Sequence, residues 1–195
     1  MKNDKNLLSM LLRYPATVLT FKDISLIWRD TREQGVVSSL AYYVKKGELL
    51  SLRRGIYAKD KDYNRMELAT KIYTPAYISF ETALTKAGMI FQYYGQIFVA
   101  SYQPREISCD GQTYCFRKLK SSLLTNPTGI EKENGYAIAC PERAFLDMLY
   151  LYKNYYFDNL RPINWQKVAE LLPIYENKEL EKRVKYYQKE FLKTI

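Results

Sequence analysis

The stretch AYYVKKGELLSLRRGIYAK, residues 41–59, decides how the N-terminal part of the chain is read. Two short apolar runs, residues 49–52 and 56–58, stand on either side of Arg53-Arg54-Gly55. Glycine suits a tight turn because it tolerates a positive φ, and apolar runs around such a turn are typical of a β-hairpin. The stretch therefore predicts the end of a helix, followed after Gly47 by two antiparallel strands.

The residues before this hairpin predict a helix from about Gly35 to Lys46. Four apolar side chains recur at helical spacing and predict its buried face, namely Val37, Leu40, Ala41 and Val44. We place Val37 at the centre of that face and advance about 100° per residue. The residues that then point outward are Gly35, Ser38, Ser39, Tyr42, Lys45 and Lys46.

Two further helices are expected upstream, at about residues 5–13 and 21–29. Thr20 and Asp23 have the spacing of a capping box, in which two side chains satisfy the free N–H groups at a helix start. A polar turn over residues 30–35 separates the second helix from the third. The order helix, helix, turn, helix, hairpin predicts a winged helix-turn-helix over residues 1–60.

Beyond residue 60 the sequence predicts a second domain, of α+β type, over residues 61–195. The polar segment KDKDYN, residues 59–64, lacks periodicity and is interpreted as the linker. Helices are expected near residues 66–73, 79–88, 141–152, 164–172 and 178–192. Strands are expected near residues 97–100, 105–109, 112–118 and 136–139, with hairpin turns at Asp110-Gly111 and Glu133-Asn134-Gly135. The expected fold class of the whole chain is α+β.

The chain is basic, with 30 Lys and Arg against 21 Asp and Glu and a net charge of +9. This balance favours a polyanionic partner, although a merely soluble basic protein has the same composition. Six cations and two acids lie between residues 45 and 61, a local net charge of +4. No apolar run reaches the roughly 20 residues that span a bilayer, and the N-terminus lacks the pattern of a signal peptide. We therefore expect a cytoplasmic protein without a membrane partner.

Composition also bears on catalysis. The sequence contains no histidine, which removes the commonest general base and the commonest zinc ligand. The three cysteines are Cys109, Cys115 and Cys140. Pairing across the Asp110-Gly111 turn puts Cys109 opposite Gln112 and Cys115 opposite Glu106, so we expect free thiols and no disulfide. The expectation is a protein that is not an enzyme, with no catalytic residue, no cofactor and no metal.

Two basic surfaces of the expected winged helix are candidates for contact with double-stranded DNA. In a major groove, serine can meet either partner of a base pair, and lysine can meet guanine or phosphate. The candidates on the third helix are Ser38, Ser39, Tyr42, Lys45 and Lys46. Arg53 and Arg54 at the hairpin tip repel each other unless a phosphate backbone or a minor groove lies beside them, and Lys59 follows the hairpin. The alternatives are a solvated helix face and an edge hairpin protected by charge.

Three stretches of the chain resemble the AbiEi antitoxins of type IV toxin–antitoxin systems. AYYVKKGELLSLRRGIYAK resembles the end of that family's winged helix, and YISFETALTKAGMI, residues 77–90, resembles the entry to its second domain. GYAIACPERAFLDMLYL, residues 135–151, resembles the family motif Ala-x-Pro-Glu-Lys-Ala-Leu-Leu-Asp. In this chain Cys140 precedes Pro141, Arg143 stands in the lysine place and Phe145 in a leucine place. The resemblance covers most of residues 15–155.

The resemblance implies a bacterial antitoxin that represses its own operon by binding operator DNA through the winged helix. Its second domain would neutralise a cognate toxin, which in this family is nucleotidyltransferase-like. The chain departs from the family at Ser38-Ser39, where basic residues are frequent. A second interpretation is a freestanding transcription regulator whose second domain binds a ligand or another protein. A third is a metal nuclease built from Asp110, Glu131 and Glu133. The sequence leaves the oligomeric state open.

Overall fold

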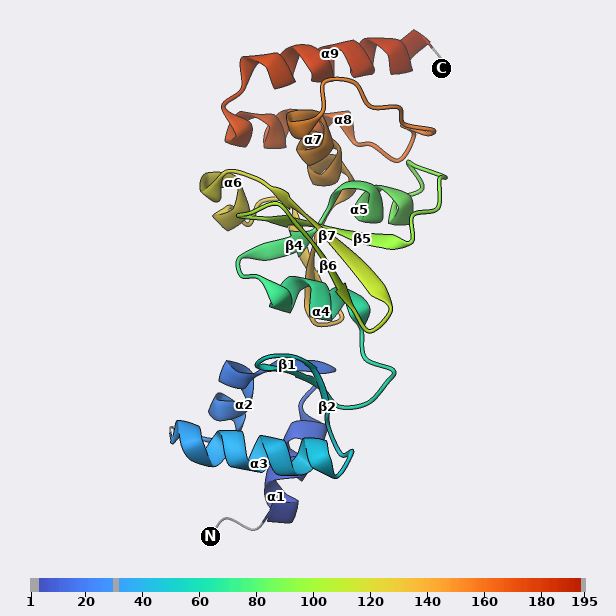
Figure 1. The fold of residues 1–195 in the computed structure, drawn as a ribbon. Coiled ribbons are helices and arrows are strands. Elements are labelled where there is room, and N and C mark those ends of the chain that lie inside the picture. Colours follow the sequence, from blue (N-terminus) through green and yellow to red (C-terminus); the bar gives the residue numbers. More distant parts are fainter. Residues whose placement is uncertain (1–3, 30–31, 194–195) are drawn as a thin grey trace.

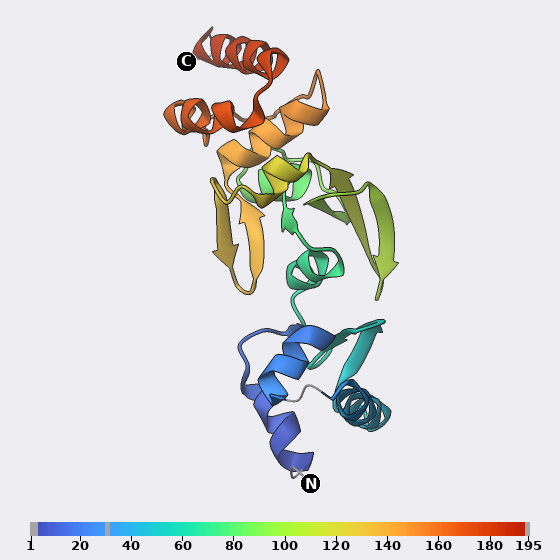
Figure 2. The same ribbon diagram turned by 90° about the vertical axis from the view of Figure 1, so that its left-hand side faces the viewer.

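The computed structural model describes residues 4–29 and 32–193, and it shows an elongated α+β protein (Figures 1 and 2). We call residues 4–58 the N-terminal unit and residues 65–193 the second unit. The elements of the N-terminal unit are α1 (Asp4–Arg13), β1 (Val18–Thr20), α2 (Phe21–Trp28), α3 (Glu33–Lys45), β2 (Leu50–Arg53) and β3 (Ile56–Ala58). The three strands form one antiparallel sheet in the order β1-β3-β2.

Local signals set most of these elements. Thr20 caps α2 as predicted, because its side chain accepts the N–H of Asp23 while the Asp23 carboxylate accepts the N–H of Thr20. The predicted hairpin is also confirmed, with Gly55 in the turn at φ +76°. Strand β1 was not predicted, since its three residues are too few to show a period and exist as a strand only by pairing with β3.

Helix α3 differs from the prediction in where it begins and which face it buries. It begins at Glu33, so Gly35 lies inside the helix rather than in a turn; residues 30 and 31 of the predicted turn lie outside the described residues. The buried side chains are those of Val36, Leu40 and Tyr43. Val37 is 47% exposed, so its placement at the centre of the buried face was wrong.

The sequence allows both registers of α3, because Val36 and Val37 are adjacent and so are Tyr42 and Tyr43. Tertiary packing decides between them. The ring of Tyr43 packs edge-on against Trp28, with centroids 6.2 Å apart, and the Trp28 indole N–H donates to the carbonyl of Leu7 in α1 at 2.9 Å. The buried face is therefore shifted by one residue from the predicted one.

The second unit is built on a mixed six-stranded sheet in the order β6-β7-β5-β4-β9-β8. Its strands are β4 (Ala76–Ile78), β5 (Gln96–Ser101), β6 (Arg105–Cys109), β7 (Gln112–Lys118), β8 (Ile130–Glu133) and β9 (Tyr136–Ala139). Its helices are α4 (Arg65–Ile72), α5 (Phe80–Lys86), α6 (Ser121–Thr125), α7 (Pro141–Leu151), α8 (Trp165–Leu171), the 3₁₀ turn η1 (Leu172–Tyr175) and α9 (Lys178–Lys193). Helix α4 lies between the sheet and the N-terminal unit, whereas α5, α7, α8 and α9 lie on the opposite side (Figure 1).

The predicted hairpin at Asp110-Gly111 is confirmed in its register. Cys109 pairs with Gln112 and Cys115 with Glu106, and all three cysteines are free. The predicted helices of the second unit and the hairpin at Asn134-Gly135 are also present. Strand β4 and the short elements α6 and η1 were not predicted, because each is at most five residues long, which is too short for a repeated apolar pattern to be recognised.

Two hydrophobic clusters make up the core of the described residues. The smaller one lies within the N-terminal unit and joins α1, α2 and α3 to Leu19 and Leu49. The larger one fills the second unit, and it also includes Val18, Ile56 and Ala58 from the N-terminal sheet. One face of the small sheet thus packs on its own helices, while the other packs against the second unit. Among the described residues, no helix is both long and apolar enough to span a membrane.

Candidate nucleic-acid interface

The face of α3 that carries the predicted DNA contacts is open to solvent. Figure 1 shows α3 on the side of the N-terminal unit that is turned away from the six-stranded sheet. Ser38, Tyr42 and Lys45 are exposed, and Ser39 is half-buried. The Ser38 hydroxyl donates to the carbonyl of Gln34 at 2.8 Å, so in this structure it points back along the helix. The second unit therefore leaves this face uncovered.

Tyr42 and Lys46 form a cation–π pair on that face. The Lys46 ammonium lies 4.5 Å from the centre of the Tyr42 ring, and the Tyr42 ring packs edge-on against Tyr43 with centroids 5.5 Å apart. A cation held over an aromatic face gains electrostatic attraction. Tyr42 is 44% exposed, so the pair presents an ordered ring and a positive charge at the surface.

The shift in the α3 register adds two apolar residues to the exposed face. Val37 and Ala41 are exposed beside Ser38 and Tyr42. Small apolar side chains in a major groove contact the methyl group of thymine. Sequence reasoning missed these residues because it assigned them to the core. No sequence signal identifies them, because both registers of α3 fit the helical period equally well.

Arg53 and Arg54 are both exposed at the turn between β2 and β3. The turn lies beside the start of α2, because the N–H of Phe21 donates to the carbonyl of Gly55 at 2.8 Å. A β-carbon at Gly55 would lie 3.9 Å from that of Phe21, so space is adequate and the positive φ is what favours glycine. The turn that carries both arginines therefore lies next to the first turn of α2.

Lys59 is placed differently from the other predicted contacts. Its ammonium donates to the carbonyls of Leu12, at 3.1 Å, and Tyr14, at the end of α1. A lysine in this position satisfies carbonyl groups that the helix leaves free. Partial burial lowers the pKa of Lys59, against the opposing charges of Glu67 and Asp60. The structure therefore separates Lys59 from the α3 and hairpin residues and ties it to α1.

A buried carboxylate joins the N-terminal unit to the second unit. Glu67 of α4 is fully buried, and its Oε2 accepts the backbone N–H of Thr17 at 2.8 Å, the Thr17 hydroxyl at 2.7 Å and the N–H of Val18 at 3.2 Å. Its Oε1 lies 3.1 Å from the ammonium of Lys71. Lys71 in turn donates to the carbonyl of Val18 and lies 3.4 Å from Asp23.

The turn between β6 and β7 makes a second set of contacts at this boundary. Asp110 accepts the hydroxyl of Tyr63 at 2.9 Å, and Arg65 donates to the Asp110 carbonyl at 2.7 Å. The Cys109 thiol contacts the carbonyl of Leu52 at 3.4 Å. We call these contacts and those of Glu67 and Lys71 the junction. Sequence reasoning missed the junction, because nothing local marks a glutamate that is buried by a distant segment.

The motif around Pro141 contributes a buried ion pair to the second unit. Arg143 and Asp147 are both fully buried, with the Arg143 Nε 3.5 Å from the carboxylate. Three hydroxyls donate to Asp147, from Tyr77 at 2.9 Å, Ser79 at 2.8 Å and Tyr175 at 2.7 Å. Burial raises the pKa of Asp147 against the opposing effects of Arg143 and the hydroxyls. This network lies in the core and presents nothing to solvent.

The residues considered for a metal nuclease do not come together. Asp110 is engaged at the junction, whereas Glu133 pairs with Lys86. Within residues 4–29 and 32–193, no group of three or more acidic or cysteine side chains is arranged to hold a metal ion. A comparison of the chain with protein-family models found no match, and a comparison with curated proteins found none either.

Proposed function

We propose that the chain is a DNA-binding protein whose N-terminal unit is a winged helix-turn-helix. The observation that carries the proposal is a set of exposed cations without acidic partners among the described residues, in α3 and at the β2–β3 turn. Lys45, Arg53 and Arg54 are exposed, and none of the three forms an ion pair within the described part of the chain. Exposed cations of this kind release counterions when they neutralise phosphates, which favours binding to DNA.

In this proposal α3 enters the major groove of double-stranded DNA. Val37, Ser38 and Tyr42 meet base edges, because they are exposed on the uncovered face. Lys45 and Lys46, in and just after the last turn of α3, meet the phosphate backbone, and Arg53 and Arg54 of the wing meet phosphate or the minor groove. Lys59 is assigned to the N-terminal fold rather than to DNA, because its ammonium holds the end of α1.

The physiological role that we propose is that of an antitoxin which represses its own operon and neutralises a nucleotidyltransferase-like toxin. The support is the resemblance of residues 41–59, 77–90 and 135–151 to the AbiEi antitoxins. The second unit supplies the antitoxin activity in this proposal, because it has its own extensive core. A freestanding regulator whose second domain binds a ligand is the alternative, and the cavity described below favours it.

DNA binding is tested by titrating the full chain with labelled duplex DNA from upstream of its own gene at several salt concentrations. The variant Arg53→Ala with Arg54→Ala should bind more weakly to all sequences. Each lost phosphate contact should reduce the slope of log affinity against log salt by about 0.9. The matched control is Lys185→Ala with Lys189→Ala, which removes the same charge from exposed positions on α9.

Equal slopes for the arginine variant and the wild-type chain would contradict the proposed wing contact. Absence of any salt-dependent binding by the wild-type chain would contradict the DNA-binding proposal as a whole. The antitoxin role has a separate test, which is growth of cells that express the neighbouring toxin gene with or without this chain. If the full chain fails to relieve the growth arrest, the antitoxin role is contradicted. The DNA-binding proposal would still stand.

A further inference from the structure

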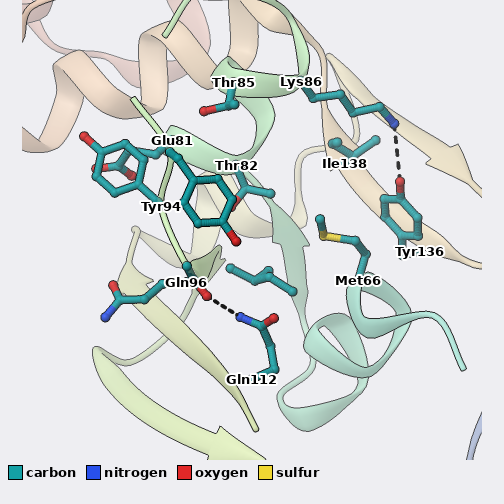
Figure 3. A pocket seen from close by; sticks show the side chains of 13 residues that line it. Met66, Glu81, Thr82, Thr85, Lys86, Tyr94, Gln96, Gln112, Tyr136 and Ile138 are labelled. Atoms are coloured by element: carbon teal, nitrogen blue, oxygen red, sulfur yellow. Dashed lines mark hydrogen bonds between the residues drawn. The ribbon is translucent and has the colours of Figure 1, made fainter. Parts of the chain in front are cut away.

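The second unit contains a cavity of about 330 Å³ between α4, α5 and the beginning of β5 (Figure 3). Its apolar walls include Met66, Ile97 and Ile138, and aromatic rings of Tyr94 and Tyr136 border it. Tyr93 also lines the cavity and is 88% exposed, so the cavity opens to solvent on that side. A concave, mostly apolar site with a few polar groups is typical of a small-molecule pocket.

The charged side chains that line this cavity are already neutralised. The Glu81 carboxylate forms a bidentate pair with Arg117, at 2.7 and 2.8 Å. The Lys86 ammonium pairs with Glu133 and lies 3.3 Å from the hydroxyl of Tyr136. A phosphate or a carboxylate would have to displace one of these partners in order to bind. The cavity therefore favours an uncharged ligand.

The remaining polar groups indicate the shape and chemistry of that ligand. Hydroxyls of Thr82 and Thr85 and the carboxamide of Gln112 line the cavity together with the apolar and aromatic groups. The Gln112 amide nitrogen already donates to the carbonyls of Gly95 and Thr113, and the Thr82 hydroxyl accepts the N–H of Phe98. The Gln112 oxygen can still accept, the Thr82 hydroxyl can still donate, and the Thr85 hydroxyl can do both. Hydroxyls and carboxamides both donate and accept hydrogen bonds, and tyrosine rings stack on flat π-systems. We propose that this cavity binds an uncharged, planar heteroaromatic molecule of the nucleobase type.

Two walls of the cavity belong to segments that form the junction. Met66 directly precedes Glu67, whose carboxylate accepts hydrogen bonds from Thr17 and Val18. Gln112 directly follows the turn that contains Asp110, which accepts the Tyr63 hydroxyl. A ligand that shifts either wall alters contacts that orient the N-terminal unit. Occupancy of the cavity is thereby coupled to DNA affinity, and this coupling rests on the proposed DNA-binding function.

The site is tested by isothermal titration of the full chain with adenine, uracil and adenosine as probes. At least one probe should bind with a Kd below about 1 mM. Thr85 is exposed on α5 and lines the cavity, so Thr85→Trp should obstruct it and weaken binding by about tenfold or more. The control is Ser122→Trp, which adds the same side chain at an exposed position on α6.

Failure of all three probes to bind the wild-type chain overturns the site, as does equal binding by the Thr85→Trp variant and the wild-type chain. Coupling is measured by repeating the DNA titration with saturating ligand, and the affinity should change by about fivefold or more. An unchanged DNA affinity with the cavity occupied overturns the coupling alone. Absence of DNA binding without any ligand contradicts the proposed function and leaves the calorimetric result on the cavity intact.

Discussion

The N-terminal and second units use their cations in different ways, although their net charges are similar. Residues 1–60 hold 11 Lys and Arg against 6 acids, and residues 61–195 hold 19 against 15. In the second unit several cations are buried or half-buried and paired, for example Arg143 with Asp147 and Arg117 with Glu81, while others such as Lys185 and Lys189 are exposed. In the N-terminal unit Arg53 and Arg54 are exposed at the tip of a turn.

Net charge alone therefore does not locate a binding surface. A buried cation must be paired, because an isolated charge is strongly disfavoured away from water. Its substitution is therefore expected to affect stability. An exposed cation without an acidic partner contributes little to stability, so its substitution is expected to affect binding instead. The predictions below test this division, beginning with the largest expected effect.

Replacement of Arg143 by methionine should destabilise the protein most. The change leaves the Asp147 carboxylate buried without its cation, which costs about 3–5 kcal/mol in the free energy of unfolding. Urea denaturation followed by circular dichroism measures this cost. As a control, Lys182→Met removes the cation of an exposed pair with Glu179 and should change the free energy of unfolding far less, because solvent screens that pair. Similar costs for both variants would contradict the distinction between buried and exposed cations.

Replacement of Glu67 by glutamine should weaken the junction. A glutamine presents an N–H₂ group where a carboxylate now accepts three hydrogen bonds from Thr17 and Val18. We expect a loss of about 1–3 kcal/mol in the free energy of unfolding. Glu131→Gln, at an exposed position on β8, should change it by less than about 0.5 kcal/mol. A Glu67 variant as stable as the Glu131 variant would show that the junction does not depend on this carboxylate.

Changes at the exposed face of α3 should alter which DNA sequence is preferred. Tyr42→Ala and Val37→Ser remove side chains that the proposal places against bases, so each should reduce discrimination between operator and random DNA by about 1 kcal/mol. Folding should change little, because both positions are exposed. A competition assay with both DNAs measures the ratio of affinities. An equal loss of affinity on both DNAs would mean that these residues only position the protein.

The smallest effect that we predict is a pH dependence at the start of α7. Burial raises the pKa of Glu142, but hydrogen bonds from the N–H groups of Asn164 and Glu142 itself, from Cys140 and from Lys167 more than offset it, so the net pKa is lowered from 4.5. A carboxyl with a lowered pKa stabilises the folded state above its unfolded pKa and loses this contribution as pH falls through the folded value. The free energy of unfolding should therefore decrease below about pH 4.5.

The pH dependence is measured by urea denaturation at pH 6 and at pH values below 4.5, the ordinary pKa of a glutamic acid side chain. Glu142→Gln should make the curve shallower in that range, because the variant no longer gains a proton on unfolding. A Glu142 variant with the same pH dependence as the wild-type chain would rule out this carboxyl as its source.

Much of the secondary structure could be predicted from sequence, because its signals are local. The capping box at Thr20, the hairpin at Asp110-Gly111 and the proline at the start of α7 each act within a few residues. Most of the predicted contact residues on α3 and the hairpin were correctly expected to be exposed. The sequence grouped Lys59 with these expected DNA contacts. Its actual role at the end of α1 was not predicted, because its carbonyl partners Leu12 and Tyr14 are distant in the sequence.

The α+β class, the order of most helices and strands, and the basic character of residues 45–61 follow from local features of the sequence. The buried face of α3, the pairing of β1 in the N-terminal sheet and the link that Glu67 makes between the two units depend on tertiary packing. The physical reason is that adjacent apolar residues such as Val36 and Val37 satisfy the same helical period equally well. Only the packing of distant groups, such as Trp28 against Tyr43, makes one arrangement lower in free energy.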